Sequence, residues 1–285
     1  STHYAHVTRL WRTRDSEICT DWFQTCVGND TLVPVRRRHR RRQDGIAELD
    51  SEGRAEELCT VEVRMDKWVD RCNNHPSNDS LNENEIDHDD YLKDWHLMQF
   101  LERRKQDEAV LYTVPPHFQH DLLNDFLLRF TKGDYRFVYW GPAGSQTDLH
   151  SDVLHSYSWS YNVVGEKRWT FYPPPTSDMT TNNEGNEKET KIILIQKEGE
   201  TVFVPSGWKH EVQNTKQTLS INHNWVTSVN VEDMYKCLQT EMQAVDNEMI
   251  AWGLDKDDAN VRESMLRGCV GMDVTGFVLM VSSRM

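Results

Sequence analysis

The chain has 285 residues, a formal net charge of −14 at pH 7 and 37% hydrophobic residues, including ten Trp. This length suffices for one large domain or two small ones with a sizeable core. The acidic balance argues against a general grip on DNA, which needs a basic surface. We see no apolar run that approaches a membrane span and no signal-peptide stretch at the start, and the six cysteines form no C-x-x-C pair. We therefore expect a cytoplasmic protein, with the nucleus as the alternative.

Residues 1–90 are expected to form a partly irregular N-terminal region. The stretch 11–27 is compatible with a helix, and 31–35 with a short strand. The arginine-rich run from Arg36 to Arg42 is either a nuclear-localisation or anion-binding patch, or a solvated loop. Because the surrounding chain is acidic, we favour the loop. The polar, turn-rich stretch 73–90 is also expected to be a loop.

Residues 91–229 are expected to form a β domain. Apolar residues at spacings of three and four predict one helix within 115–130, and the prolines before it suit a helix start. Short segments rich in aromatic and β-branched residues then alternate with turn signals, from DYRFVYWG to TLSINHNW. This pattern predicts an all-β barrel or sandwich.

Residues 230–285 are predicted to be helical. One apolar stripe runs along Met234, Leu238, Met242, Val245, Met249 and Trp252. Such a stripe usually packs against the protein's own core. A subunit contact is the alternative, because Met adapts to partner surfaces.

His150 and Asp152 are the central candidates for chemistry. They lie two positions apart in an extended run, so their side chains point to the same side. His210, from another strand, would complete two imidazoles and one carboxylate, which is the ligand set of non-haem Fe(II) oxygenases. The alternative is a pair of surface histidines and a salt-bridged aspartate, and the β context favours the metal site. We interpret His155 and His223 as structural or supporting residues.

Lys167 begins a predicted strand. A lysine inside a barrel needs an anionic partner, because a buried ammonium alone is costly. A dicarboxylate cosubstrate would supply that partner. The alternative is an exposed lysine paired with Glu166.

Three motifs together resemble the JmjC (jumonji C) family of 2-oxoglutarate oxygenases: H-x-D at 150–152, GEKRWTFYPP, and FVPSGWKH. The resemblance runs from about Tyr91 to Val229. The strings YLKDWHL, DYRFVYWGPAGS and SINHNWV are similar to one branch, the lysyl hydroxylases that act on a translation termination factor. The resemblance implies a mainly β fold with flanking helices, namely a double-stranded β-helix (jelly-roll, cupin-like barrel) followed by C-terminal helices.

The resemblance also assigns roles to single residues. His150, Asp152 and His210 match the iron ligands, and Lys167 matches the lysine that binds the distal carboxylate of 2-oxoglutarate. Thr147 and Asn222 match further cosubstrate contacts, although each could equally be an ordinary strand residue. Looser matches are Ser160, Tyr91 and Asn224.

The implied function is an Fe(II)- and 2-oxoglutarate-dependent protein hydroxylase that consumes O2. A protein substrate, such as a translation termination factor, is implied with it, and we expect no membrane partner. A homodimer through the C-terminal helices is a further expectation. The alternatives are a JmjC lysine demethylase, a catalytically silent barrel that acts as a binding module, and a cupin-type zinc hydrolase.

Overall fold

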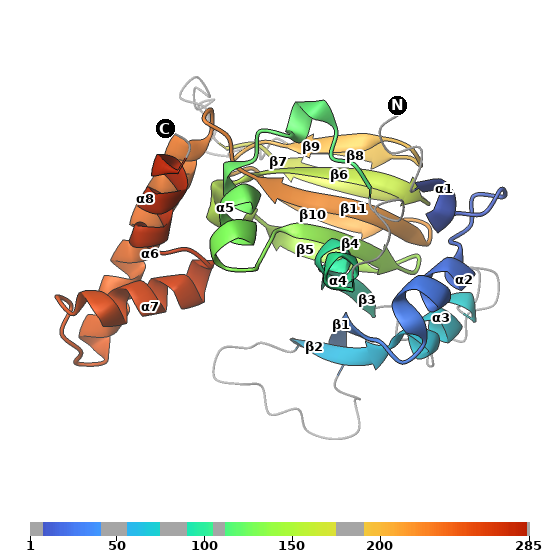
Figure 1. Cartoon of the computed structure of the whole chain (residues 1–285), viewed down its shortest axis with the longest axis horizontal. Helices are drawn as coiled ribbons and strands as arrows, with labels where there is room; N and C mark the ends of the chain where they lie inside the picture. Colours follow the sequence, from blue (N-terminus) through green and yellow to red (C-terminus); the bar gives the residue numbers. More distant parts are fainter. Residues whose placement is uncertain (1–7, 41–55, 75–89, 105–111, 175–190, 284–285) are drawn as a thin grey trace, which may run out of the picture.

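The computed structural model describes residues 8–40, 56–74, 90–104, 112–174 and 191–283. Their strands form two antiparallel sheets, and helices pack at both ends of the sheets (Figure 1). The predicted mainly β fold with flanking helices is confirmed. The architecture is the double-stranded β-helix, or jelly roll.

The larger sheet has seven strands. In spatial order they are β2 (Glu56–Arg64), β1 (Leu32–Arg40), β3 (Tyr91–Trp95), β4 (Arg136–Gly141), β11 (Thr218–Trp225), β6 (Tyr157–Val164) and β9 (Thr201–Val204). The smaller sheet contains β5 (Gln146–His150), β10 (Lys209–Asn214), β7 (Lys167–Tyr172) and β8 (Ile192–Gln196). The strands predicted from DYRFVYWG onward are thus confirmed. The N-terminal strands β1 and β2 extend the same sheet.

Strand β11 shows how the two faces of the larger sheet differ. Leu219 and Ile221 are fully buried in the main hydrophobic core. The alternate side chains Asn222 and Asn224 line a cavity between the sheets. Ser220 accepts a hydrogen bond from Lys167, which lines the cavity too. This period of two follows from strand geometry, and it brings polar groups into the barrel.

Short N-terminal helices cover the outer face of the larger sheet. They are α1 (Thr8–Trp11), α2 (Thr20–Phe23), the π-helix η1 (Gln24–Gly28), α3 (Met65–Asn73) and α4 (Leu97–Arg103). Trp11, Phe23, Trp68 and Trp140 are fully buried where these helices meet the sheet. The expected single helix over 11–27 is wrong, because a turn with Ser16 at φ +62° separates α1 from α2.

The prediction of a solvated loop for the arginine run is wrong for Arg36–Arg40, which belong to β1 and pair with β2. Two carboxylates in and just before β3 compensate the charges of the run and so allow it to form a strand. Arg37 forms an ion pair with Asp90, whose side chain is 1% exposed, and Arg36 forms one with Asp94. The rest of the run and most of the predicted loop 73–90 lie outside the described residues.

The helix predicted within 115–130 is shorter than expected. It divides into a 3-10 turn, η3 (Pro116–Phe118), and α5 (Leu122–Phe130). Helix α5 starts late because the side chain of Asp121 accepts a hydrogen bond from the Asn124 amide and caps the helix.

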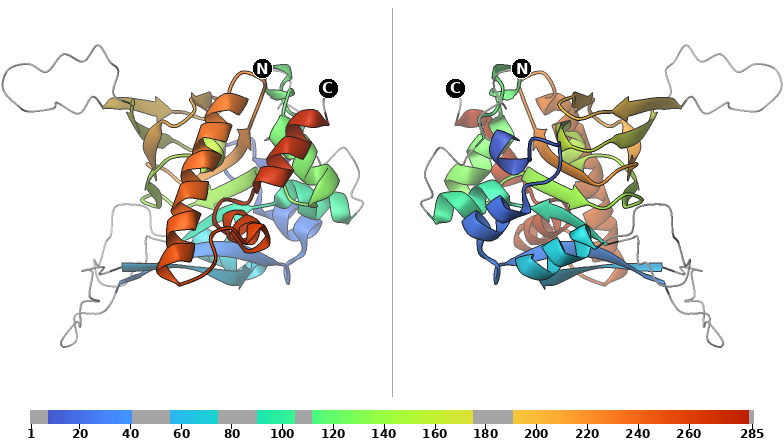
Figure 2. Two further views of the ribbon diagram at one scale, coloured as in Figure 1. Left: turned by 90° about the vertical axis from the view of Figure 1, so that its left-hand side faces the viewer. Right: turned by 90° about the vertical axis from the view of Figure 1, so that its right-hand side faces the viewer.

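The C-terminal segment is helical, as predicted, with α6 (Val231–Ala251), α7 (Ala259–Val270) and α8 (Val274–Ser282). The stripe residues Met234, Leu238, Val245 and Met249 are buried with α5, which confirms the packing interpretation for them, whereas Trp252 is 66% exposed. These helices lie at the end of the barrel opposite α1–α3 (Figure 2). Of the described residues, no single helix is long and apolar enough to cross a membrane. Helices α7 and α8 taken together meet this requirement by length and composition only, and the pair is bent by 74°.

Candidate metal centre

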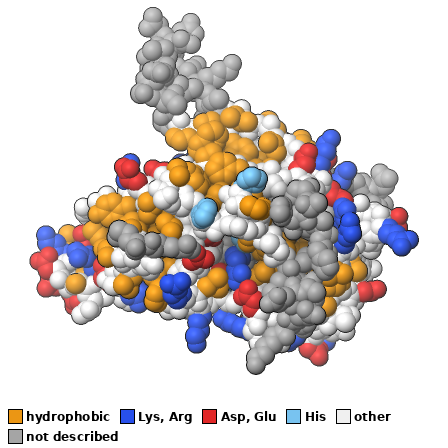
Figure 3. All heavy atoms as spheres, turned by 45° about the horizontal axis from the view of Figure 1, so that its top comes forward, with side chains coloured by type: hydrophobic (Ala, Val, Ile, Leu, Met, Phe, Trp, Pro, Cys, Tyr) orange, Lys and Arg blue, Asp and Glu red, His pale blue; other side chains and the backbone are white. Residues whose placement is uncertain are grey.

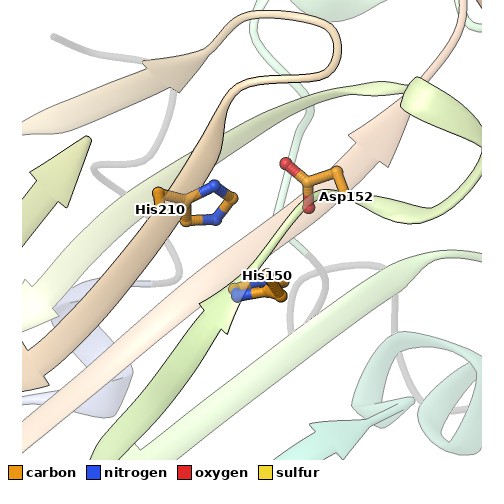
Figure 4. A group of neighbouring side chains, drawn as sticks. All are labelled: His150, Asp152 and His210. Carbon is orange, nitrogen blue, oxygen red and sulfur yellow. The ribbon is translucent and has the colours of Figure 1, made fainter. Parts of the chain in front are cut away.

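Two histidines meet across neighbouring strands of the smaller sheet. His150 is the last residue of β5, and it lies directly opposite His210 of β10. Asp152 follows in extended backbone (φ −62°, ψ 146°), just before the turn η4 (Val153–His155). One ligand atom from each of the three side chains lies within 4.8 Å of the other two (Figure 4). The structure therefore brings the three predicted ligands together.

Hydrogen bonds set the tautomer of both imidazoles. The Nδ1 of His150 donates to the carbonyl of Asp148 (2.8 Å), and the Nδ1 of His210 donates to the carbonyl of Trp208 (3.1 Å). A carbonyl only accepts, so Nδ1 carries the proton and the Nε2 lone pair is left for a metal. Burial, and then the neighbouring His210, lower the pKa of His150. This favours the neutral, metal-binding imidazole.

Asp152 is oriented by two side chains. The Ser158 hydroxyl donates to Oδ2 (2.7 Å), and the Asn224 amide donates to Oδ1 (2.7 Å). Ser158 and Asn224 face each other across β6 and β11. Each carboxylate oxygen keeps a lone pair for a metal. Sequence reasoning assigned Ser158 no role, because its place beside Asp152 depends on this pairing between distant strands.

The donor set fits one divalent ion. Two neutral imidazole nitrogens and one carboxylate oxygen on one side, with no described Cys in the cluster, suit non-haem Fe(II) better than a closed structural zinc site. The supporting hydrogen bonds are of the type that holds ligands in place before a metal binds.

Lys167 lies inside the same cavity and is 1% exposed. Its Nζ donates a hydrogen bond to Ser220 Oγ (2.7 Å), and among the described residues it forms no ion pair. Burial lowers the pKa of Lys167 to about 7. The alternative of an exposed pair with Glu166 is wrong, since Glu166 accepts instead from Thr215 (2.9 Å). A buried cation without a counter-charge is a site for an anion.

Gly165 places Lys167 at the start of β7. It has φ +89°, in the left-handed region that favours glycine. A Cβ at this position would lie 2.0 Å from the carbonyl oxygen of Gln217. The glycine of the G-x-K motif is therefore required by the turn between β6 and β7.

Thr147, Asn222 and Ser160 also line the cavity. Asn222 donates to Ser220 Oγ (2.9 Å), so it belongs to the network that holds Lys167. The Ser160 hydroxyl is buried and has no hydrogen-bond partner among the described residues. A ligand with carboxylate or carbonyl oxygens would satisfy such an orphaned donor. The cosubstrate roles of these three residues stay predictions.

His155 and His223 lie outside the ligand cluster. His155 has φ +46°, and its carbonyl accepts a hydrogen bond from Ser206. His223 is buried on the other face of β11, with Nε2 2.5 Å from the Tyr112 hydroxyl, and burial lowers its pKa to about 3. Neither residue belongs to the ligand cluster, and a structural or supporting role for them stays an interpretation.

Two imidazoles and one carboxylate within a double-stranded β-helix define the cupin-like class of proteins with a mononuclear metal site. The JmjC family, described as "JmjC domain, hydroxylase", matches residues 176–225, which include His210. The chain belongs to the JmjC family.

The similarity to individual relatives extends over longer stretches of the chain. A Gallus gallus protein named 2-oxoglutarate and iron-dependent oxygenase JMJD4 is 39% identical over 208 residues, covering 66% of this chain and 48% of that protein. The human protein of the same name is 36% identical, covering 66% and 49%. An Arabidopsis thaliana protein named arginine-specific demethylase JMJ20 is 31% identical, covering 97% and 63%. The chain thus spans about half the length of the JMJD4 relatives.

Among solved structures, the Drosophila melanogaster CENP-C cupin domain is 10% identical, with a TM-score of 0.24, and the match covers 32% of this chain and 59% of that chain. This likeness is too weak to support an argument about fold or function.

Proposed function

We propose that this chain is an Fe(II)- and 2-oxoglutarate-dependent oxygenase that hydroxylates a side chain of a protein. The observation that carries the proposal is one cavity that contains both His150, Asp152 and His210 and the uncompensated ammonium of Lys167. A metal site and an anion site side by side suit a keto dicarboxylic acid. The names of the JMJD4 relatives support the same cofactors, Fe(II) and 2-oxoglutarate, with O2 as oxidant.

The residues around the cavity have separate proposed roles. His150, Asp152 and His210 would hold the metal on one side, while Ser158 and Asn224 keep the carboxylate in place. Lys167 would hold the distal carboxylate of 2-oxoglutarate, with Thr147, Asn222 and Ser160 nearby. Iron, when bound, supplies the oxidative chemistry that couples loss of CO2 from the keto acid to oxygen insertion.

Anaerobic reconstitution tests this proposal. Protein with Fe(II) and 2-oxoglutarate should develop a metal-to-ligand absorption band, and admission of air should release succinate. His150→Ala should lose both signals, and Lys236→Met, which replaces an exposed lysine outside the cavity lining, should keep them. If the wild-type protein binds iron and 2-oxoglutarate but never turns the keto acid over, the chain is a binding module instead.

For the substrate, we propose lysyl hydroxylation of a translation termination factor, which rests on resemblance to the JMJD4 branch. A protein substrate agrees with the surface. Apolar side chains gather on the face that carries β8 and β9 (Figure 3), where the strands leave Ile192 to Ile195 and Phe203 exposed. Apolar surface of this kind often marks a docking site. The net charge of −14 would steer a basic partner toward the chain.

Demethylation is the second candidate, because the relative named an arginine-specific demethylase matches 97% of this chain. Mass spectrometry of peptides distinguishes the two reactions. A hydroxylase adds one oxygen to an unmodified peptide, whereas a demethylase removes methyl groups and releases formaldehyde. Formaldehyde from a methylated peptide, without oxygen addition to the unmodified one, would replace our proposal.

A further inference from the structure

Strand β3 contains a bulge at its centre. Leu92 pairs with Trp140 of β4, but the next pair joins Trp95 with Val138, so β3 holds one extra residue. Asp94 is the bulged residue, and its backbone has φ +57°. In a regular strand Leu92 and Trp95, three positions apart, would point to opposite faces. The bulge lets both enter the hydrophobic core, while Lys93 lines the cavity between the sheets.

Asp94, the acidic neighbour of Lys93 in the sequence, already accepts hydrogen bonds from two other side chains. Asp94 accepts a hydrogen bond from Arg36 (3.1 Å) through one carboxylate oxygen and from the Tyr139 hydroxyl (2.8 Å) through the other. Lys93 itself forms no ion pair and no hydrogen bond through its ammonium among the described residues. Asp94 therefore divides its negative charge between Arg36 and Lys93, and it neutralises Lys93 only in part.

Lys93 and Lys167 reach the same aromatic ring from different sheets. Their Nζ atoms lie 5.7 Å and 5.8 Å from the centre of the Tyr139 ring, which attracts cations through its π face. Of the described residues that line this cavity, Asp152 is the one carboxylate, and it faces the metal site. The cavity thus holds two ammonium groups that form no ion pair with a carboxylate among the described residues. A bound divalent metal would add to this positive charge.

We propose that Lys93 is a second cationic contact for the cosubstrate, an inference that rests on the proposed function. Lys93 acts with Lys167 to bind the two negative charges of 2-oxoglutarate. The bulge at Asp94 and the Arg36–Asp94 pair are the structural features that hold Lys93 in this role. Lys93 is a binding residue here and takes no part in bond making.

The test measures binding under argon, so that no turnover is needed. Mn2+ is titrated into metal-free protein, and 2-oxoglutarate is then titrated into the Mn2+-loaded protein by calorimetry. Lys93→Met keeps most of the side-chain length and should weaken 2-oxoglutarate binding roughly tenfold, the typical loss of one charge-assisted contact. The same variant should bind Mn2+ more tightly, by roughly two- to tenfold, because one repelling charge is gone.

The comparison variants are Lys167→Met, which should also weaken 2-oxoglutarate binding, and Lys236→Met. The latter removes the same charge at an exposed position paired with Glu232 and should change neither affinity. Lys93→Arg should retain most of the 2-oxoglutarate affinity.

Opposite effects of Lys93→Met on metal and cosubstrate support the proposal. Unchanged 2-oxoglutarate affinity overturns it, including the case in which only the KM for a peptide rises, because Lys93 would then face the protein substrate. Parallel weakening of both affinities also overturns it, since Lys93 would then be supporting the fold. If the wild-type protein itself fails to bind 2-oxoglutarate, the proposed function falls together with the role of Lys93.

Discussion

Replacing Lys167 with Met should stabilise the protein when metal and cosubstrate are absent. The Lys167 ammonium is buried with one hydrogen bond, from Nζ to Ser220, and no ion pair among the described residues. Burial lowers its pKa from 10.5 to about 7, so the unfolded chain binds a proton that the folded chain holds less tightly. Unfolding therefore takes up protons between these two values, and the stability of the wild-type protein rises with pH across that window.

The size of the effect follows from the same shift. One pKa unit corresponds to about 1.4 kcal/mol, so the buried ammonium opposes folding by about 4 kcal/mol at pH 7. Loss of the hydrogen bond to Ser220 removes roughly 1 kcal/mol of stability in the variant. We therefore expect Lys167→Met to raise the free energy of unfolding by about 3 kcal/mol at pH 7, with the gain shrinking as the pH approaches 10.5.

Urea denaturation of metal-free protein from pH 7 to 9.5, followed by circular dichroism, measures this difference. Lys236→Met removes an exposed lysine and serves as the control for net charge. A Lys167→Met variant that is less stable than the wild type at pH 7 would refute the reasoning. So would a difference that does not change with pH, because the ammonium would then already be compensated in the folded chain.

Three further substitutions test single contacts. Asn224→Ala removes one of the two donors to Asp152 and should weaken Mn2+ binding roughly 10- to 100-fold in a calorimetric titration; unchanged affinity would show that Asp152 needs no such support. Tyr112→Phe leaves the buried His223 imidazole without its partner and should lower the free energy of unfolding by about 1–3 kcal/mol in urea, with Mn2+ affinity as the readout that stays constant. Gly165→Ala introduces both a left-handed backbone strain and a clash, and we expect a loss of about 2 kcal/mol or more; a stable variant that still binds 2-oxoglutarate would contradict our account of the turn.

The ligand cluster was predictable from the sequence because its geometry is local. The offset of two between His150 and Asp152 places both side chains on one side as long as the backbone stays extended. It does stay extended at Asp152, although strand pairing already ends at His150. His210 was predictable because it follows a turn at the start of a strand, which brings it to the same edge of the sheet.

The contacts around the ligands were not predictable in this way. Ser158 reaches Asp152 because β6 pairs with β11, and Leu92 and Trp95 both reach the core on either side of Lys93 because β3 shifts its register against β4. Neither feature can be inferred from the spacing of residues along the sequence. The arginine run illustrates the same limit. Composition favoured a loop, but Asp90 and Asp94 lie more than 50 positions away and supply the carboxylates that let Arg36 and Arg37 join a sheet.

The alternation along β11 ties the stability of the fold to the geometry of the site. A shift of one residue would turn Leu219 and Ile221 into the cavity and move Asn222 and Asn224 into the hydrophobic core. The burial of the apolar set therefore also fixes the amide that orients Asp152. His223 occupies a position on the apolar face, which explains why it is held neutral against Tyr112 and is not available as a ligand, despite lying one residue from Asn222 and Asn224.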